Sequence, residues 1–344
     1  MKTLSIVIPT YNVEKYLAKC LNSLVYDEDV LEDIELIVVN DGSKDSSLSI
    51  AKKYEKKYPK TIKVIDKENG GHGSTINAGL KVAQGKYFRV IDSDDWVNID
   101  EFGNYVRELK KLDTDIVLTN YCKEFIYSGE KELFTYPNLE YNKKYDLNKF
   151  DYDLLGDLYF FMATTTFKTE KLRKSGVWLD EKTFYVDTEF IILPYLEMQS
   201  MIYLDYDIYR YFIGRPDQSV NIQNYVRNKL HHEKVTKRVL SFYKEIPDNE
   251  PKKVYIRKII LQLLNTHYII FCKARLDNKK DVKLIREFDK YLKENNFDMY
   301  EALRNGQRYV KWNQRTNFIF CQSFHNFLSR FCDKLDRKNI WRRG

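Results

Sequence analysis

Short apolar runs and segments of helical periodicity alternate through the first 125 residues. The apolar runs predict strands at residues 4–8, 34–39, 62–65, 87–91 and 116–121. Between them, apolar residues three or four positions apart predict helices at 13–25, 45–58, 74–83 and 99–112. Strands and helices alternating at this spacing form a parallel sheet with helices on both faces, and strands apolar along their length fit a sheet buried on both sides. The pattern therefore predicts an α/β fold.

The pattern changes after residue 125, where polar and aromatic residues replace the aliphatic runs. Residues 123–145 predict a hairpin around Ser128-Gly129, and a helix is expected from about Asp187. Further strands are predicted at 160–167, 201–204 and 209–213. Beyond Asn221 the periodicity is helical, at 222–245, 251–275, 280–295, 298–310 and 317–334. We therefore expect a sheet-containing domain at 1–221 and an all-helical region at 222–344, with a hinge near Pro247 and Pro251.

Charge is distributed unevenly between these parts. Residues 251–344 carry 22 lysines and arginines against 9 aspartates and glutamates, whereas the whole chain carries 57 against 50. A basic, aromatic-rich helical region suits contact with an anionic membrane surface. An interface in a homo-oligomer, or a set of solvated lysine faces, explains the same pattern. No recognised nucleic-acid motif accompanies the charge, so no nucleic-acid partner is expected.

The composition is that of a globular protein, with 43% apolar and 31% charged residues and no apolar run of about 18 residues that could cross a membrane. The first strand begins at Leu4 with no signal-peptide pattern before it. Five cysteines are scattered without metal-like spacing, as in a reduced protein. We therefore expect a cytoplasmic protein, whose basic region is a candidate for peripheral contact with the inner face of the membrane.

The strand at 87–91 ends at Asp92-Ser93-Asp94-Asp95, which places three carboxylates within four residues. Side chains two positions apart in an extended segment point the same way, so Asp92 and Asp94 can converge on one ligand. Oxygen donors without cysteine or histidine suit Mg²⁺ or Mn²⁺, and Mg²⁺ commonly binds one or two carboxylates together with substrate phosphates. A solvated acidic turn or a helix cap would use the same residues.

Other predicted strands also end on residues that suit a nucleotide. The first strand leads into Pro9-Thr10-Tyr11-Asn12, and the second leads into Asn40-Asp41-Gly42-Ser43. An acidic side chain such as Asp41 can accept a hydrogen bond from a ribose hydroxyl or a base N–H. Residues 68–74 contain three glycines in four positions before a helix, which lets the backbone approach a phosphate closely. Each segment on its own is also ordinary turn chemistry.

Together these segments resemble the family 2 glycosyltransferases, which are inverting enzymes with the GT-A fold. The segments at 7–12, 39–43 and 69–79, and the Asp-x-Asp motif at 92–94, follow in the family's order and spacing. The resemblance covers residues 3–125. It implies a mixed sheet flanked by helices, with a nucleotide-sugar-binding half at 1–125 and an acceptor and base half at 126–221.

The resemblance also implies a role for each motif residue. The nucleobase, usually uracil, would be surrounded by Pro9, Thr10, Tyr11 and Asp41. The metal that bridges the diphosphate, Mn²⁺ or Mg²⁺, would be held by Asp94 together with Asp92, which also lies by the ribose. The rest of the nucleotide-sugar site would be formed by Asn12, Asn69, Gly71, Asn77 and Ser93.

One position in this half departs from the family pattern. Many relatives carry an arginine where this chain has Ile76, so an expected cation near the diphosphate is missing. The segment 209–220 resembles the family's chain after the base helix, and its Arg215, with Gln218, is a candidate substitute because a guanidinium can bind phosphate oxygens bidentately. Lys67 and His72 are further candidates. Residues 215–217 are equally explained as a surface turn with a local ion pair.

The catalytic base is expected from the second half. Inversion by single displacement needs a carboxylate that takes the proton from the attacking acceptor hydroxyl. The family places a Glu-Asp pair at the start of a helix, and the matching residues here are Val186 and Asp187, with Glu189 as the fallback. An aspartate at this place also suits a helix N-cap.

We therefore expect a metal-dependent, non-processive inverting glycosyltransferase. It would transfer one sugar from a nucleotide-diphosphate sugar, with a UDP-sugar as the first expectation. The acceptor would be a glycan, a lipid-linked glycan or a glycoprotein. The product would belong to cell-surface polysaccharide, teichoic acid or glycoprotein glycans. Two alternatives stay open. A sugar-1-phosphate nucleotidyltransferase shares the architecture and the metal acids but opens with a glycine-rich, arginine-containing loop. A non-catalytic nucleotide-sugar or carbohydrate-binding module would keep the pocket without needing Asp187.

Overall fold

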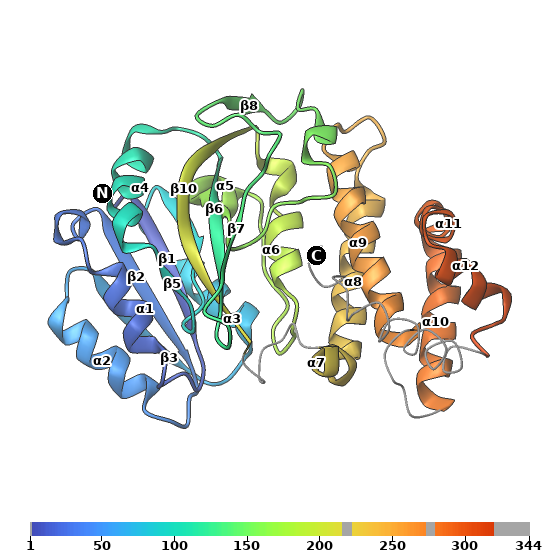
Figure 1. The fold of residues 1–344 in the computed structure, drawn as a ribbon, viewed down its shortest axis with the longest axis horizontal. Helices are drawn as coiled ribbons and strands as arrows, with labels where there is room; N and C mark the ends of the chain where they lie inside the picture. Colours follow the sequence, from blue (N-terminus) through green and yellow to red (C-terminus); the bar gives the residue numbers. More distant parts are fainter. Residues whose placement is uncertain (1, 215–221, 273–278, 320–344) are drawn as a thin grey trace. The chain divides into compact units, whose positions relative to one another are not determined.

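The computed structural model describes residues 2–214, 222–272 and 279–319. The chain divides into two compact units (Figure 1), which we call the sheet unit, Met1–Gln218 with Asn249–Val254, and the helical unit, Ser219–Asp248 with Tyr255–Gly344. The short segment 249–254 thus belongs to the sheet unit although its neighbours on both sides do not. Its buried Lys252 donates a hydrogen bond to the carbonyl of Leu196 at 2.9 Å, which fastens the segment there.

A mixed sheet flanked by helices forms the sheet unit, as the sequence predicts. The strands run in the order β3-β2-β1-β4-β9-β6-β10-β5. Their bounds are β1 Leu4–Thr10, β2 Ile34–Asp41, β3 Ile62–Lys67, β4 Tyr87–Val90, β5 Trp96–Val97, β6 Ile116–Phe125, β9 Thr165–Lys168 and β10 Ser200–Ile213. The first four strands are parallel, β9 is antiparallel to both β4 and β6, and β10 is parallel to β6. The short strands β7 Lys131–Phe134 and β8 Lys144–Asp146 pair antiparallel with β6 and β10.

Helices cover both faces because the strands are apolar on both. The helices are α1 Leu17–Leu24, α2 Ser47–Lys57, α3 His72–Val82, α4 Ile99–Lys111, α5 Thr169–Lys174 and α6 Asp187–Ile192. Apolar residues of α1, α2 and α4 form one core with alternate residues of β1 and β2. On α3, Gly79 lies directly on Val7 of β1, where a Cβ would have no room. On α6, Phe190 packs against Phe88 of β4 and Phe167 of β9.

Several predicted elements differ from the structure, among them the single helix predicted at 222–245, which divides into Ile222–Arg227 and Lys229–Glu245. The predicted strands at 201–204 and 209–213 are one strand, β10, because the polar residues between them form a bulge that continues the pairing with β6. The predicted strand at 160–167 is shorter, since β9 begins only at Thr165. The predicted helix at 298–310 divides at Gln307, which is the C-cap of α11 and the N-cap of α12. Most of the helix predicted at 317–334 lies outside the described residues.

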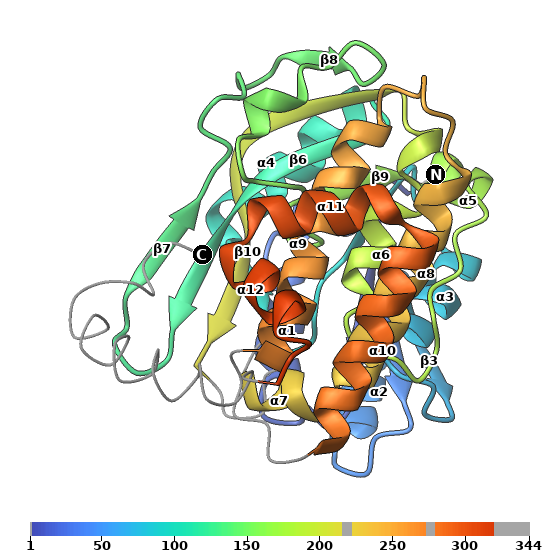
Figure 2. The ribbon, with the colours of Figure 1, turned by 90° about the vertical axis from the view of Figure 1, so that its right-hand side faces the viewer.

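The helical unit consists of α7 Ile222–Arg227, α8 Lys229–Glu245, α9 Lys253–Cys272, α10 Lys279–Asn295, α11 Phe297–Gly306 and α12 Arg308–Arg315. Helices α8 and α9 lie side by side (Figures 1 and 2), and the rings of the buried His232 and His267 stack between them. Tyr268 of α9 packs on Phe288 of α10. Among the described residues, no helix is both long enough and apolar enough to cross a membrane.

Candidate active site

The acidic turn lies between β4 and β5, at the edge of the sheet where the parallel strands end. Asp95 is buried, and its carboxylate accepts hydrogen bonds from the Tyr209 hydroxyl at 2.6 Å and the Phe212 N–H at 2.8 Å. Burial and the neighbouring Asp92 raise the pKa of Asp95 well above its usual range. Asp95 therefore fastens the turn to β10, while Asp92 and Asp94 are only half-buried. Nothing in the sequence indicated this link to Tyr209.

His72, the first residue of α3, pairs with the acidic turn. Its Nε2 lies 2.9 Å from Oδ1 of Asp92. Desolvation lowers the pKa of His72, but the charge and the hydrogen bond of Asp92 and the charges of Asp187 and Asp41 together outweigh it, so the pKa is raised. The sequence suggests a phosphate contact for His72. The structure places it beside Asp92, with the charge of Asp187 also acting on it.

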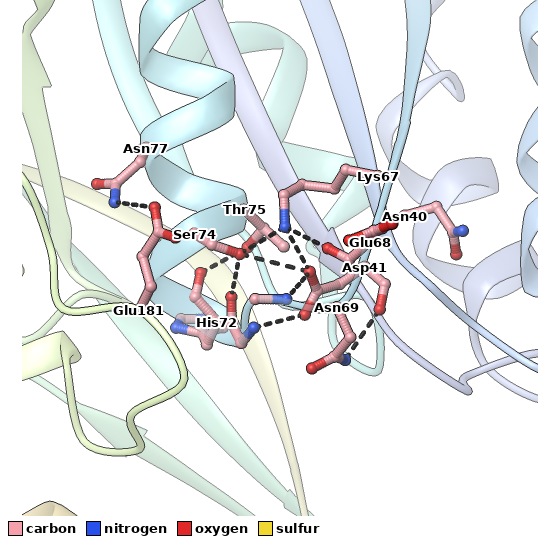
Figure 3. Close-up of polar contacts among 12 residues, drawn as sticks. Asn40, Asp41, Lys67, Glu68, Asn69, His72, Ser74, Thr75, Asn77 and Glu181 are labelled. Carbon is pink, nitrogen blue, oxygen red and sulfur yellow. Dashed lines mark hydrogen bonds and ion pairs between the residues drawn. The ribbon is translucent and has the colours of Figure 1, made fainter.

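Asp41, at the end of β2, is the centre of a hydrogen-bond network with the glycine loop (Figure 3). It is 2% exposed. Its carboxylate accepts hydrogen bonds from the N–H groups of Gly70 and Gly71, both at 2.8 Å, and from Nζ of Lys67 at 2.9 Å. These donors fix the position of the carboxylate. The contact with a nucleobase that the resemblance implies for Asp41 stays a prediction.

This network engages Gly71 and Lys67, two residues that the sequence analysis assigns to the nucleotide-sugar site. The N–H of Gly71 does not face a phosphate, because Asp41 occupies it. Lys67 is equally engaged, since its Nζ donates to Asp41, to the carbonyl of Glu68 and to the hydroxyl of Ser74. The family's arginine is replaced here by Ile76, whose side chain is buried. In this arrangement Gly71 and Lys67 bind other parts of the protein, so neither offers a free donor in place of that arginine.

Gly71 and Gly73 allow the backbone of residues 180–182 to lie directly against the glycine loop. Gly71 has φ +82°, and a Cβ on it would lie 3.1 Å from the backbone nitrogen of Lys182. A Cβ on Gly73 would collide with the carbonyl oxygen of Asp180. Lys182 also donates its N–H to the carbonyl of Gly70 at 2.5 Å. The glycine loop therefore holds the segment 179–183 against the start of α3.

Asn77 fixes the same junction from the next turn of α3. Its Nδ2 donates to the carbonyl of Leu179 and its Oδ1 accepts from the Leu179 N–H, both at 2.9 Å. The side chain also reaches Glu181 at 3.5 Å (Figure 3). Asn77 is buried and both ends of its amide are engaged within the protein, and the contact with a nucleotide-sugar expected for it stays a prediction. Its geometry is that of a positioning residue.

Asp187 begins α6, just beyond the segment that the glycine loop holds. Its side chain is open to solvent, yet the protein atoms around it desolvate it and raise its pKa. The charge of His72 acts in the opposite direction, and the charge of Asp92 adds to the rise. Glu189 is fully buried, and its carboxylate accepts the N–H of Asp180 at 2.9 Å. Glu189 is therefore closed to an acceptor hydroxyl, whereas Asp187 is open to solvent, and the role of Asp187 as base stays a prediction.

The end of β1 divides into buried and exposed residues. Pro9 and Thr10 are buried in the strand, and the Thr10 hydroxyl donates to the carbonyl of Ile8 at 3.0 Å. Tyr11 is 49% exposed. Asn12 is exposed too, and its Oδ1 accepts the N–H of Lys44 at 2.7 Å, which ties the ends of β1 and β2 together. Of these residues, Tyr11 is best placed to stack on a nucleobase.

The remaining residues predicted for the nucleotide-sugar site differ in burial, and two of them lie outside the described residues. Ser93 is buried within the acidic turn. Asn69 is exposed and donates from its amide to the carbonyl of Asp41 at 2.9 Å. Arg215 and Gln218 lie outside the described residues. The binding roles assigned to all these residues stay predictions.

The donor set fits a divalent cation that is completed by its substrate. Asp92 and Asp94 offer oxygen atoms at a half-buried site. No cluster of three or more histidines, cysteines or acids that could hold a metal exists among the described residues. Mg²⁺ and similar hard ions need no such cluster when one or two carboxylates share the ion with phosphate oxygens and water. The residues present therefore suit a metal–diphosphate complex.

A mixed α/β sheet flanked by helices, with acids at its carboxyl edge, is the arrangement of the GT-A fold. Residues 5–173 match the model of the family described as "Glycosyl transferase family 2". This part of the chain belongs to that family, and the protein is a glycosyltransferase related to enzymes of teichoic acid and polysaccharide synthesis.

Two curated relatives illustrate the similarity. The "Uncharacterized glycosyltransferase EpsJ" of Bacillus subtilis is 28% identical, over 90% of this chain and 92% of the relative. The "Poly(ribitol-phosphate) beta-glucosyltransferase" of Bacillus spizizenii is 29% identical over 77% of this chain but only 40% of the relative. This chain thus spans nearly all of EpsJ and less than half of the second enzyme.

A solved structure agrees with the fold. The crystal structure of residues 1–349 of S. aureus TarS in complex with UDP-GlcNAc superposes with a TM-score of 0.67 at 19% identity, covering 95% of this chain and 92% of that chain. At this identity the likeness shows the GT-A fold, and the fold prediction is confirmed.

Proposed function

We propose that this glycosyltransferase is an inverting, metal-dependent enzyme that moves one sugar from a nucleotide-diphosphate sugar, first of all a UDP-sugar, to a carbohydrate acceptor of a cell-surface glycopolymer. The observation that carries the proposal is the electrostatic coupling of Asp187 with Asp92 through His72, because these residues come from three separate parts of the chain. Charges that act on one another in this way support a base at Asp187 and donor-site acids at 92 and 94. The GT-A fold and the family assignment support the same reaction class over a nucleotidyltransferase.

In this reaction the acceptor oxygen forms a bond to the anomeric carbon of the donor sugar. The bond from that carbon to the diphosphate oxygen breaks, and its electron pair leaves with the nucleotide diphosphate. Asp187 takes the acceptor's proton, for which its raised pKa makes it a better base than an ordinary aspartate. Asp94 and Asp92 would hold a Mn²⁺ or Mg²⁺ ion, which supplies charge stabilisation to the departing diphosphate.

Donor hydrolysis by water tests this proposal without a known acceptor. Purified protein is incubated with UDP-, GDP- and dTDP-sugars in the presence of Mn²⁺, Mg²⁺ or EDTA, and the released nucleotide is measured. We expect turnover of one donor that EDTA abolishes and that Asp94→Ala reduces at least about a hundredfold. Metal-independent turnover would refute the metal role. An absence of turnover and of nucleotide binding would refute the donor site.

The basic charge of residues 251–344 supports a second element of the proposal, contact with an anionic membrane that carries a lipid-linked acceptor. The full chain is expected to cosediment with phosphatidylglycerol-containing vesicles and to be released by salt. Equal cosedimentation with neutral vesicles would remove the electrostatic argument. The alternative, an oligomer interface, would appear as a dimer or higher species in light scattering.

A further inference from the structure

Tyr209 of β10 links the acidic turn to the interior of the sheet unit. Its ring lies in the apolar core that α1 and α4 form with the sheet, and the residue is only 2% exposed. Its hydroxyl donates to Oδ2 of Asp95 at 2.6 Å. The same oxygen lies 3.4 Å from the backbone nitrogen of Asp92 and 3.4 Å from Oδ2 of Asp92. One phenolic oxygen thus contacts two of the aspartates in the turn.

The bulge in β10 explains how Tyr209 comes to lie beside the turn. The pairing of β10 with β6 is regular up to Tyr203, and its register shifts between Tyr203 and Asp207 and again between Asp207 and Tyr209. Beyond these shifts, Tyr209 pairs with Tyr121 of β6 and with Val97 of β5. A bulge changes the direction in which the side chains of its strand point. The irregularity in β10 therefore decides which of its side chains meets the acids.

The same strand fixes the end of the turn. The N–H of Phe212 donates to Oδ1 of Asp95 at 2.8 Å, so both oxygens of that carboxylate are bound to β10. The N–H of Asp95 donates in turn to the carbonyl of Asp92 at 3.0 Å, which closes the turn. Asp94 lies between these two residues in the chain, so its backbone is confined between two points that β10 holds.

The carboxylate of Asp92 is contacted from two sides. Its Oδ1 lies 2.9 Å from Nε2 of His72, and its Oδ2 lies 3.4 Å from the hydroxyl of Tyr209. His72 begins α3 and Tyr209 belongs to β10, so the two contacts come from separate parts of the chain. A carboxylate held between two groups is oriented before an ion arrives, and hydrogen-bond partners of this kind raise the metal affinity of the acids that they orient.

We propose that Tyr209 is a positioning residue of the metal–diphosphate site, whose hydroxyl holds the acidic turn, through Asp95 and Asp92, in the geometry that binds the divalent cation. This inference rests on the proposed function, because it takes Asp92 and Asp94 as the acids that hold the metal. Tyr209 gives its proton to Asp95 and acts through the acids, without being a metal ligand itself. Removal of a partner that orients metal ligands typically lowers metal affinity about 10- to 100-fold.

Mn²⁺ binding measures this role without any turnover. The full chain is titrated with Mn²⁺ in the presence of UDP, and the free ion is quantified by its electron paramagnetic resonance signal. Tyr209→Phe keeps the ring in the core and removes the hydroxyl, so the dissociation constant for Mn²⁺ should rise about 10- to 100-fold. Asp94→Ala gives the reference value for the loss of a ligand.

The matched control is Tyr105→Phe. Tyr105 is also fully buried in the sheet unit, and its hydroxyl is likewise hydrogen-bonded, to the Thr166 hydroxyl at 2.7 Å. Both substitutions remove one buried hydroxyl, so both should lower the midpoint of thermal unfolding to a similar extent. Only Tyr209→Phe should weaken Mn²⁺ binding, and this difference distinguishes a positioning role from a merely structural one.

Asp95→Asn breaks the same link from its other end. It replaces the oxygen that accepts from Tyr209 or the one that accepts from Phe212 with an amide, so it too should weaken Mn²⁺ binding. Because Asp95→Asn and Tyr209→Phe act on one hydrogen bond, the double variant should bind Mn²⁺ little worse than the weaker of the two single variants. If Tyr209→Phe does not fold, Asp95→Asn measures the same link.

The outcomes separate this inference from the proposed function. A Tyr209→Phe protein that binds Mn²⁺ as the wild type does would overturn the positioning role and leave the donor chemistry intact. Equal weakening by Tyr105→Phe would overturn it too, since any lost buried hydroxyl would then have the same effect. Fully additive effects of Asp95→Asn and Tyr209→Phe would refute the route through Asp95. A wild type that neither binds Mn²⁺ nor hydrolyses a donor would refute the proposed function, and this inference with it.

Discussion

Two aspartates in the sheet unit lie in opposite surroundings. Asp41 is buried, and two backbone N–H groups and a lysine from one short stretch of chain bind it. Asp187 is open to solvent, and it is surrounded by charges from parts of the chain far from it in sequence. The first arrangement holds a carboxylate in one position. The second makes a carboxylate accessible and more basic, which is what proton transfer requires.

The two regions meet at the start of α3, and this contact explains why the first region is built as it is. Gly71 and Gly73 admit the backbone of residues 180–182, and Asn77 binds Leu179. The network around Asp41 thus orders the loop that in turn positions the chain leading to Asp187. A motif that the sequence assigns to the nucleotide thus also positions the chain that leads to Asp187.

The largest expected effect concerns the exposed aspartate. Asp187→Asn removes the proton acceptor while keeping the size of the side chain, so the turnover rate of sugar transfer should fall by about 10² to 10⁴. UDP affinity, measured by calorimetry, should be unchanged. Asp153→Asn, an exposed carboxylate in the same half of the unit, is the control. Normal turnover in the Asp187 variant would show that the two aspartates do not differ in the way described.

The buried aspartate should instead affect stability. Asp41→Ala leaves the N–H groups of Gly70 and Gly71 and the ammonium of Lys67 without their acceptor. The free energy of unfolding should fall by about 3 kcal/mol, measured by urea denaturation followed by circular dichroism. Asp41→Asn, which keeps one carbonyl oxygen, should lose less. Equal stability of all three proteins would mean that the network contributes nothing to the fold.

A third substitution tests the contact between the regions. Alanine is normally better than glycine in a helix by about 1 kcal/mol, but at Gly73 the added Cβ collides with the Asp180 carbonyl. Gly73→Ala should therefore lower the free energy of unfolding by about 1 to 3 kcal/mol and reduce turnover. Gly306→Ala meets no atom within 4 Å and is the matched control. A neutral Gly73→Ala would show that segment 179–183 is free to move away from α3.

The smallest expected effect is a shift in pH dependence. Asp187 must be ionised to act as a base, so kcat/KM should fall as the pH drops through its pKa, at a higher pH than for an ordinary aspartate. The charge of His72 lowers that pKa. His72→Gln removes this charge and leaves Asp92 uncompensated, so the acidic limb of the profile should move to still higher pH. If the acidic limb of the kcat/KM profile stayed in place or moved to lower pH, the charge of His72 would not be acting on Asp187.

Much of the fold was predictable because local patterns determine it. The continuous apolar runs at β1, β2 and β4 gave the parallel part of the sheet, and the polar residues that follow them gave its functional edge. The antiparallel insertion of β9 was not predictable, since four residues carry no signal for the neighbours they pair with. The sequence also did not predict that β10 is one continuous strand, because the polar residues at its bulge have the composition of a turn.

The sequence by itself determined the class of the protein and the edge of the sheet where the site lies, because strand ends and motif spacing are local properties of the chain. Only the tertiary structure decided which polar groups are open to a ligand. Asp41, Asn77, Asp95 and Asp187 are all polar residues next to strand or helix ends, yet three are buried and one is exposed. Burial depends on contacts between distant segments, such as Leu179 with α3 and Tyr209 with Asp95, and those contacts exist only once the chain has folded.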